Sequence, residues 1–260
     1  MMNNPKKCTQ KDINKIWIKK WEIVRGLSSR EIFNSRLFPE AFPVIKKYIP
    51  NKFKNLLDAG GGTGKFGLKL AQEFPESFIT ISDILDESLS IARELAVETG
   101  IKNVWFKKDD ILTSAFPDNH FDVVFSDAMI QYLQDYRKAI REIQRITKPG
   151  GRIVITAVNF WNFHTLYKWL LALAGKEYQY GYEKSFSKRE LTEAMEKEGI
   201  RVIATDGFYV GYGIFRLRSH HQIFRFLGRL INRLSKILDK FTGRFFSKNF
   251  GFDIVVVGQK

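Results

Sequence analysis

Short apolar runs alternate with amphipathic stretches along the central part of the chain. After the glycines near residue 60, and again after residues 83 and 127, the apolar positions have the spacing of a helix. This alternation predicts a parallel sheet with right-handed crossovers, the doubly wound α/β class. The apolar runs lie at 54–59, 78–83, 103–110 and 121–127, and the helical stretches at 65–73, 87–99 and 132–147.

The segment after 147 continues the sheet and adds to it. Proline and paired glycines at 148–151 predict a break before a fifth strand, and Ser187 with Glu190 three residues on predicts a capping box. Two more apolar runs, at 200–210 and 250–260, bring the expected sheet to seven strands with an antiparallel last strand. We therefore expect a Rossmann-like domain over 51–260 after a helical extension over 1–50, with a lid at 159–184 and a basic helical insertion at 214–248.

The first predicted strand runs into a glycine loop. A phosphate-binding P-loop is excluded, because Ala59 stands where its first glycine should be and Phe66 follows Lys65 where a hydroxyl is needed. A dinucleotide fingerprint fits Gly62, Gly64 and Gly67. However, a carboxylate directly before the glycines would repel a pyrophosphate and attract the amino group of a methionine moiety.

The glycine loop and three later motifs resemble those of class I S-adenosylmethionine-dependent methyltransferases. The first motif of that family, Asp/Glu-x-Gly-x-Gly-x-Gly, is matched by Asp58, Gly60, Gly62 and Gly64. The resemblance covers 54–158 well and 185–260 more loosely. It implies S-adenosylmethionine as the cofactor and a transferase of the kind found in the ubiquinone and menaquinone group.

The resemblance also assigns cofactor roles after the next three strands. It places Asp83 on the ribose hydroxyls, Asp110 at the adenine amine, and Ser126 at the mouth of the site. Ile84 and Ile111 are the apolar neighbours of the adenine. Asp109 and Asp110 compete for the same role, and the register favours Asp110.

The acceptor side of the site is less clearly marked. Methyl transfer requires donor and acceptor to be held in line, and an oxygen or carbon acceptor also gives up a proton. His164, just past the fifth strand, is the candidate base, with a polar structural role as the alternative. We predict that Asp127, Tyr132, Trp161 and Tyr167 shape an acceptor pocket suited to a small apolar, aromatic or lipid-like molecule.

Composition places further limits on the protein. Cys8 is the only cysteine, which excludes an internal disulfide and a thiolate metal cage, so we predict no metal site and a cytoplasmic location. The formal net charge is +14, and the excess lies before residue 55 and within 214–248. A basic surface of this kind favours anionic partners.

Residues 223–241 have the spacing of a basic amphipathic helix. Three interpretations stay open: a helix that packs its apolar side on its own domain, a helix lying on an anionic membrane surface at the inner face of the membrane, and a nucleic-acid contact, in that order. The rival functions are an RNA methyltransferase or RNA-binding protein and a dinucleotide-dependent oxidoreductase. The sequence does not indicate the oligomeric state.

Overall fold

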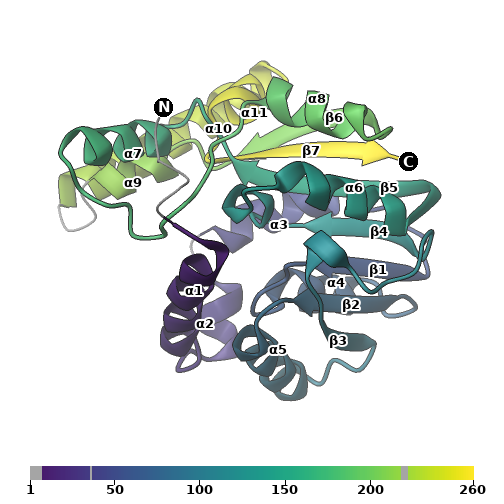
Figure 1. The fold of residues 1–260 in the computed structure, drawn as a ribbon. Helices are drawn as coiled ribbons and strands as arrows, with labels where there is room; N and C mark the ends of the chain where they lie inside the picture. The colour runs from purple at the N-terminus through teal and green to yellow at the C-terminus, as the bar shows by residue number, and fades with distance from the viewer. Residues whose placement is uncertain (1–7, 36, 218–221) are drawn as a thin grey trace.

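A seven-stranded sheet runs through the computed structural model, which describes residues 8–35, 37–217 and 222–260 (Figure 1). The strand order is β3-β2-β1-β4-β5-β7-β6, and only β7 runs antiparallel to its neighbours. The predicted fold class is therefore confirmed. The strands are β1 Asn55–Ala59, β2 Phe78–Asp83, β3 Val104–Lys108, β4 Phe121–Ser126, β5 Thr147–Val158, β6 Arg201–Phe208 and β7 Asp253–Gln259.

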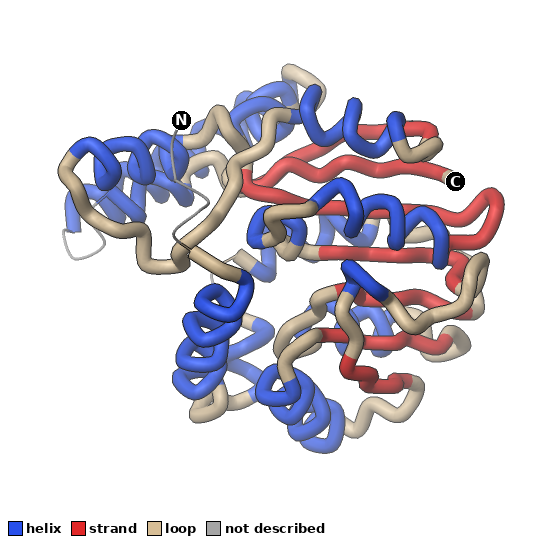
Figure 2. The backbone as a smooth tube through the Cα atoms, viewed as in Figure 1, coloured by secondary structure: helices blue, strands red, loops and turns tan. Residues whose placement is uncertain are grey.

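Helices cover both faces of the sheet (Figure 2). Alternate residues of each strand point to opposite faces, so Leu56 of β1 joins one core and Leu57 the other. The first core packs against α2 Ser29–Phe33, α3 Phe38–Lys46, α4 Lys65–Glu73 and α5 Asp86–Thr99. The second packs against α6 Tyr136–Ile146 and α8 Lys188–Lys197. The extension over 1–50 thus contributes α3 to the central core.

The largest differences from the predicted boundaries concern the start of α6 and the start of β5. The helix expected from residue 132 begins at Tyr136, because Asp135 caps it by accepting a hydrogen bond from Lys138 N, and a separate short turn, η2 Ile130–Tyr132, precedes it. The expected break at 148–151 is instead part of β5, where the pairing with β4 shifts register. Ser187 does cap α8 as predicted, while Glu190 pairs with Lys184.

The lid and the insertion form a helical layer at one end of the sheet. It consists of α7 Phe163–Leu173, α9 Tyr212–Leu217, α10 Gln222–Phe241 and α11 Phe245–Phe250. Both α7 and α10 pack against α9. Positions 218–221 of the predicted insertion lie outside the described residues.

Of the three interpretations left open for the insertion helix, packing of its apolar side on the domain disagrees with the structure. The buried residues of α10 are Gly228, Asn232, Ser235 and Asp239, and its large apolar side chains point outward. Small and hydrogen-bonding side chains permit a closer approach to neighbouring backbone than leucine or phenylalanine would.

Candidate functional site

The carboxyl ends of the parallel strands converge on one cavity of about 410 Å³. Asp58 near the end of β1 pairs in register with Ile81 of β2, and Asp83 at the end of β2 pairs with Lys108 of β3. Ligands of doubly wound sheets bind at this edge, next to the point where strand order reverses. Here the reversal falls between β1 and β4.

The glycine loop lines the cavity with backbone. Gly60, Gly62 and Gly64 all have left-handed φ angles, of 68°, 57° and 73°, which residues with side chains rarely adopt. A Cβ at Gly60 would lie 2.4 Å from Cγ of Met129, so a side chain does not fit there. Gly60, Gly62 and Thr63 line the cavity, whereas Gly64 is buried behind it as the residue before α4.

Asp58 has one carboxylate oxygen held by the protein and one left over. Its Oδ2 accepts a hydrogen bond from Gly67 N at 2.9 Å, while its buried Oδ1 has no protein partner. A buried acceptor without a partner is costly unless a ligand supplies the donor. Since Asp58 lines the cavity, the protonated amino group of a methionine moiety fits this position.

Two further carboxylates share the floor of the cavity with Asp58. Burial, together with the nearby Asp127, raises the pKa of Asp58 to about 8. Burial also raises the pKa of Asp127, which accepts a hydrogen bond from Thr156 Oγ1 at 2.6 Å, and the pKa of Asp83. A floor with several carboxylates in a desolvated setting attracts a cation.

Asp83 connects the glycine loop to the start of α5. Its Oδ2 accepts a hydrogen bond from Gly62 N and its Oδ1 one from Leu85 N, each at 2.9 Å. Ile84 also lines the cavity. The predicted ribose acid and its apolar neighbour therefore lie together at the end of β2.

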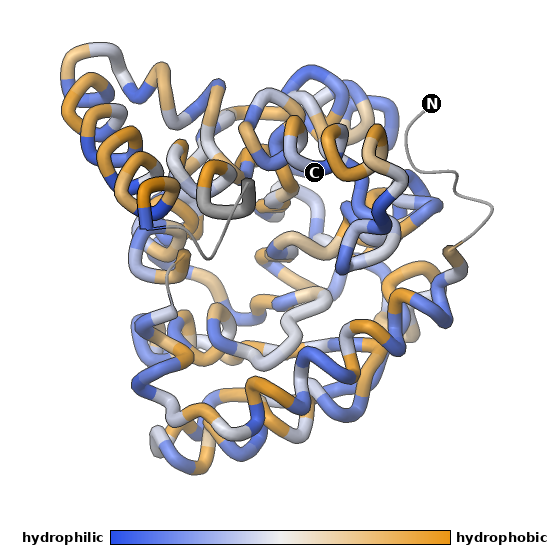
Figure 3. Tube along the Cα trace, turned by 90° about the vertical axis from the view of Figure 1, so that its left-hand side faces the viewer, coloured by the Kyte–Doolittle hydropathy of each residue, from blue (hydrophilic) through white to orange (hydrophobic). Residues whose placement is uncertain are grey.

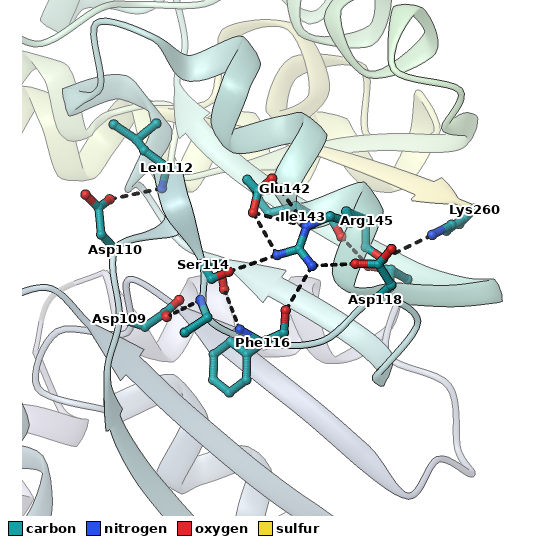
Figure 4. Close-up of polar contacts among 12 residues, drawn as sticks. Asp109, Asp110, Leu112, Ser114, Phe116, Asp118, Glu142, Ile143, Arg145 and Lys260 are labelled. Atoms are coloured by element: carbon teal, nitrogen blue, oxygen red, sulfur yellow. Dashed lines mark hydrogen bonds and ion pairs between the residues drawn. The ribbon is translucent and has the colours of Figure 1, made fainter.

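The loop after β3 is held in place by Arg145 of α6 (Figure 4). The guanidinium donates to the carbonyl oxygens of Ser114 and Phe116, both at 2.9 Å, and to Asp118 Oδ1. This loop carries Asp110 and Ile111 to the cavity, where Asp110 Oδ1 accepts a hydrogen bond from Leu112 N.

Asp109 lines the cavity beside Asp110, so the acid that the register disfavoured is present as well. Asp109 Oδ1 accepts a hydrogen bond from Ala115 N at 2.9 Å, and its buried Oδ2 has no partner. By their positions, either acid could accept a hydrogen bond from the exocyclic amine of the adenine.

Aromatic side chains line the cavity together with the glycine loop. Helix α1 Gln10–Val24 lies across it, and Trp21 comes within 3.1 Å of where a Cβ on Gly62 would stand. The Trp17 ring meets Tyr132 edge-on at 5.1 Å between centroids and lies 5.7 Å from Tyr180. Helix α1, from the N-terminal extension, therefore forms part of the cavity wall.

A buried polar cluster lies behind this aromatic wall, centred on Glu183. Its Oε1 accepts from Lys168 Nζ at 3.0 Å and lies 2.9 Å from His164 Nε2, and its Oε2 accepts from the Tyr132 and Tyr178 hydroxyls. Burial alone would raise the pKa of Glu183, but Lys168 and His164 outweigh it and hold the pKa well below its ordinary value. Glu183 is thus an ionised carboxylate that also lines the cavity.

Several predicted site residues lie elsewhere. His164 is completely buried and does not reach the cavity, because α7 turns its polar side inward to Glu183. Trp161 is 65% exposed, and neither it nor Tyr167 lines the cavity. Ser126 lies beneath the surface of the cavity, whereas Asp127 and Tyr132 line it as expected.

Sequence reasoning missed Glu183 and Lys168. Glu183 lies in an irregular segment, and its partners stand 5 to 51 residues away along the chain. The one available signal was Lys168 on a helix whose other polar residues share its face, which indicates a buried polar side. The described residues contain no group of three or more His, Cys, Asp or Glu side chains able to hold a metal.

A Rossmann-like sheet of this order, with a glycine loop and acids at the ends of β1, β2 and β3, defines the class of S-adenosylmethionine-dependent methyltransferases. The model of the methyltransferase domain family matches residues 50–199. The chain therefore belongs to the methyltransferase domain family, and it is an enzyme that uses S-adenosylmethionine.

Individual relatives agree with this assignment. A demethylmenaquinone methyltransferase of Listeria monocytogenes is 27% identical over 177 residues, covering 65% of this chain and 74% of the relative. An S-adenosylmethionine-dependent methyltransferase of Thermotoga maritima superposes with a TM-score of 0.60 at 18% identity, over 95% of this chain and 99% of that one.

A third relative was solved with the cofactor. It is phosphoethanolamine N-methyltransferase 2 of Haemonchus contortus in complex with S-adenosylmethionine, with a TM-score of 0.58 and 20% identity over 90% of this chain and 60% of that one. At such identities, both solved structures show likeness of fold alone.

Proposed function

We propose that the enzyme methylates a small aromatic, lipid-like acceptor of the quinol type. The observation that carries this proposal is the aromatic lining of the cavity, to which Trp17, Trp21, Tyr132 and Tyr180 contribute. Flat aromatic side chains suit an apolar ring. The names of the curated relatives support the same acceptor class.

In this proposal the cofactor lies between the glycine loop and the acids of the strand ends. Asp58 binds its amino group, the backbone of Gly60 and Gly62 approaches its methionine part, and Asp83 binds the ribose. Gly64, behind the cavity, turns the chain into α4. Ile84, Asp110 and Ile111 complete the adenine side, and Ser126 supports the site from beneath. Bound S-adenosylmethionine supplies an electrophilic methyl group.

The acceptor would lie against Asp127 and Tyr132, which line the cavity, whereas Trp161 and Tyr167 do not contact it. His164, predicted as a base, is instead proposed as a positioning residue, because its ring contacts Glu183 rather than the cavity. Glu183 in turn accepts a hydrogen bond from the Tyr132 hydroxyl at 2.8 Å. This bond fixes the orientation of the Tyr132 side chain, which faces the acceptor.

Labelled methyl transfer tests the acceptor class. We expect transfer from radiolabelled S-adenosylmethionine to a demethylated naphthoquinol bearing an isoprenoid tail, presented in detergent, and no transfer to bulk RNA. Labelling of RNA alone would overturn the proposal. Calorimetry should detect binding of S-adenosylhomocysteine and none of NADH.

Replacing Asp83 tests the cofactor side of the site. We expect Asp83→Ala to weaken S-adenosylhomocysteine binding roughly ten- to a hundredfold, about 1.5 to 3 kcal/mol, because both the ribose contact and the Gly62 hydrogen bond are lost. Glu76→Ala, at an exposed position after α4, is the matched control. Equal affinities of the two variants would remove Asp83 from the site.

We also propose that the enzyme is cytoplasmic and attaches peripherally to the inner face of an anionic membrane, where a lipid-like acceptor is found. The net charge of +14, concentrated outside the catalytic core, supports an anionic partner, and the exposed apolar side chains of α10 favour lipid over nucleic acid. No helix of the described residues is long and apolar enough to cross a bilayer.

A further inference from the structure

Helix α10 is amphipathic in the reverse of the usual sense. The face that it buries is narrow and consists of Gly228, Asn232, Ser235 and Asp239. The side chains that a soluble helix normally turns inward are exposed. They are Ile223, Phe226, Leu227, Leu230, Leu234, Ile237, Leu238 and Phe241, the last of them 83% exposed.

Specific contacts fix this orientation. Asn232 Nδ2 donates to Glu40 Oε1 of α3 at 2.8 Å, and Asp239 Oδ1 accepts from Phe246 N of α11 at 2.8 Å. Gly228 lies so close to Gly211 that a Cβ on Gly211 would come within 1.9 Å of the Gly228 carbonyl oxygen. A rotation that buried the leucines would break these hydrogen bonds and force this close contact apart.

Helix α7 shows the same reversal. It buries His164, Thr165 and Lys168, the first and last in contact with Glu183. Its exposed apolar residues are Phe163, Leu166, Trp169, Leu170 and Leu173, with Trp161 just before the helix. Since α7 and α10 both pack on α9, the two apolar faces belong to one helical layer, at the top of Figures 1 and 3.

Charge identifies what covers the apolar face of α10. A row of basic side chains borders it, formed by Arg225, Arg229, Arg233, Lys236 and Lys240. The only acid of the helix, Asp239, is buried against α11. A second copy of the chain would bring two such basic rows together, which is unfavourable. An anionic lipid surface offers apolar chains to one face and negative headgroups to the other.

We propose that α10, together with α7, inserts its apolar face into the interface of an anionic membrane. The basic row then lies at the level of the headgroups, and the helices stay parallel to the membrane surface rather than crossing it. This gives the proposed peripheral location a defined contact surface. It also reassigns α7 from a lid over the cavity to part of that surface.

Flotation with vesicles of equal parts phosphatidylglycerol and phosphatidylcholine tests the apolar face. We expect the Leu230→Ser/Leu234→Ser variant to lower the partition coefficient at least tenfold, since two side chains that would be buried in lipid are lost. Val97→Ser, at an apolar side chain of α5 that is 83% exposed, is the matched control and should bind as the parent does. Both variants change exposed side chains, so we expect each to melt at the same temperature as the parent protein.

The basic row and α7 need separate variants. Arg229→Gln/Arg233→Gln should lower binding to the anionic vesicles about twenty-five-fold, fivefold for each charge, and reduce the preference for phosphatidylglycerol over phosphatidylcholine alone by a similar factor. Leu166→Ser/Leu170→Ser should weaken binding independently of the α10 variant. If it has no effect, α7 is not part of the surface.

Other outcomes would overturn the inference. One is flotation of the Leu230→Ser/Leu234→Ser variant that equals that of the parent. Another is a dimer of the parent, detected by light scattering, that becomes a monomer in this variant. The third is tight RNA binding by the parent that this variant loses. Calorimetry with S-adenosylhomocysteine in the absence of lipid separates this inference from the proposed function. A variant that binds cofactor normally yet fails to float affects only the membrane surface.

Discussion

At the scale of single residues, Asp58 shows how burial prepares a carboxylate for a cationic ligand. With a pKa of about 8 instead of 3.8, it holds a proton near neutral pH that the unfolded chain has already lost. The folded enzyme without cofactor is therefore destabilised as the pH rises from about 4 to 8. Binding of an ammonium group favours the ionised form of Asp58, so the carboxyl group loses its proton when the cofactor binds.

This coupling predicts a pH-dependent affinity. Binding of S-adenosylhomocysteine should strengthen as the pH rises from 6 to 8, by up to about tenfold per pH unit, and level off above about 8, because the proton on Asp58 must leave first. Calorimetry in buffers of different ionisation enthalpy should detect the released proton. Asp58→Asn should flatten the profile; a profile that stays steep would place the titrating group elsewhere.

Residues at strand ends were the easiest to predict from the sequence. Asp58, Asp83 and Asp110 each follow an apolar run, and parallel pairing then brings them to one edge of the sheet. Glu183 could not be predicted in this way, because no pattern surrounds it and its environment comes from three separate segments. The same limit applies to His164, whose position in the chain indicated nearness to the site but not that its ring would be buried.

At the scale of elements, Arg145 links α6 to the loop that carries Asp110. Arg145→Ala should destabilise the fold by about 2 kcal/mol, because two carbonyl oxygens lose a charged donor. It should also weaken cofactor binding severalfold. Urea unfolding and calorimetry measure the two effects.

Arg141→Ala on the same helix is the control, since Arg141 forms an exposed pair with Glu198 and should contribute under about 0.5 kcal/mol. Similar losses for both arginines would mean that α6, rather than the loop, accounts for the effect.

The Glu183 cluster joins α7, the following loop and η2, so it should behave as a unit. Glu183→Gln alone leaves Lys168 as a buried cation and should cost about 3 to 5 kcal/mol. Adding Lys168→Met should recover part of that loss. A double-mutant cycle by chemical denaturation measures the coupling, and strictly additive effects would contradict the buried ion pair.

The sequence predicted well which segments are helices and which are strands. It did not predict which neighbouring element each helix face contacts. Apolar spacing predicted α4 over the residues that it occupies and predicted α10 to within a residue. Periodicity shows that a helix has an apolar side but not what that side contacts. For α10 the deciding information was tertiary: Gly228 meets Gly211, and Asn232 meets Glu40.

At the scale of the whole molecule, α1 joins the N-terminal segment to the catalytic edge of the sheet. Ile13 is its only buried side chain, and α5 is the helix that it mainly contacts. An element with so few buried contacts should open readily, and a ligand beneath it should stabilise the closed form.

Hydrogen exchange should reveal this behaviour. We expect S-adenosylhomocysteine to slow amide exchange over Gln10–Val24 severalfold and to leave β6 and β7 unchanged, since those strands contact the cavity only near Phe208 and Asp253. Mass spectrometry of peptic fragments resolves the segments. Equal protection throughout the chain would instead indicate global stabilisation.

The position of β7 has a consequence for the order of assembly. This strand lies between β5 and β6, yet it follows both of them in the chain. While the protein is being synthesised, β5 has a free edge and β6 has no neighbour until Asp253–Gln259 leaves the ribosome. Completion of the sheet is therefore delayed until that point, and the nascent chain exposes a long apolar edge that a chaperone could shield.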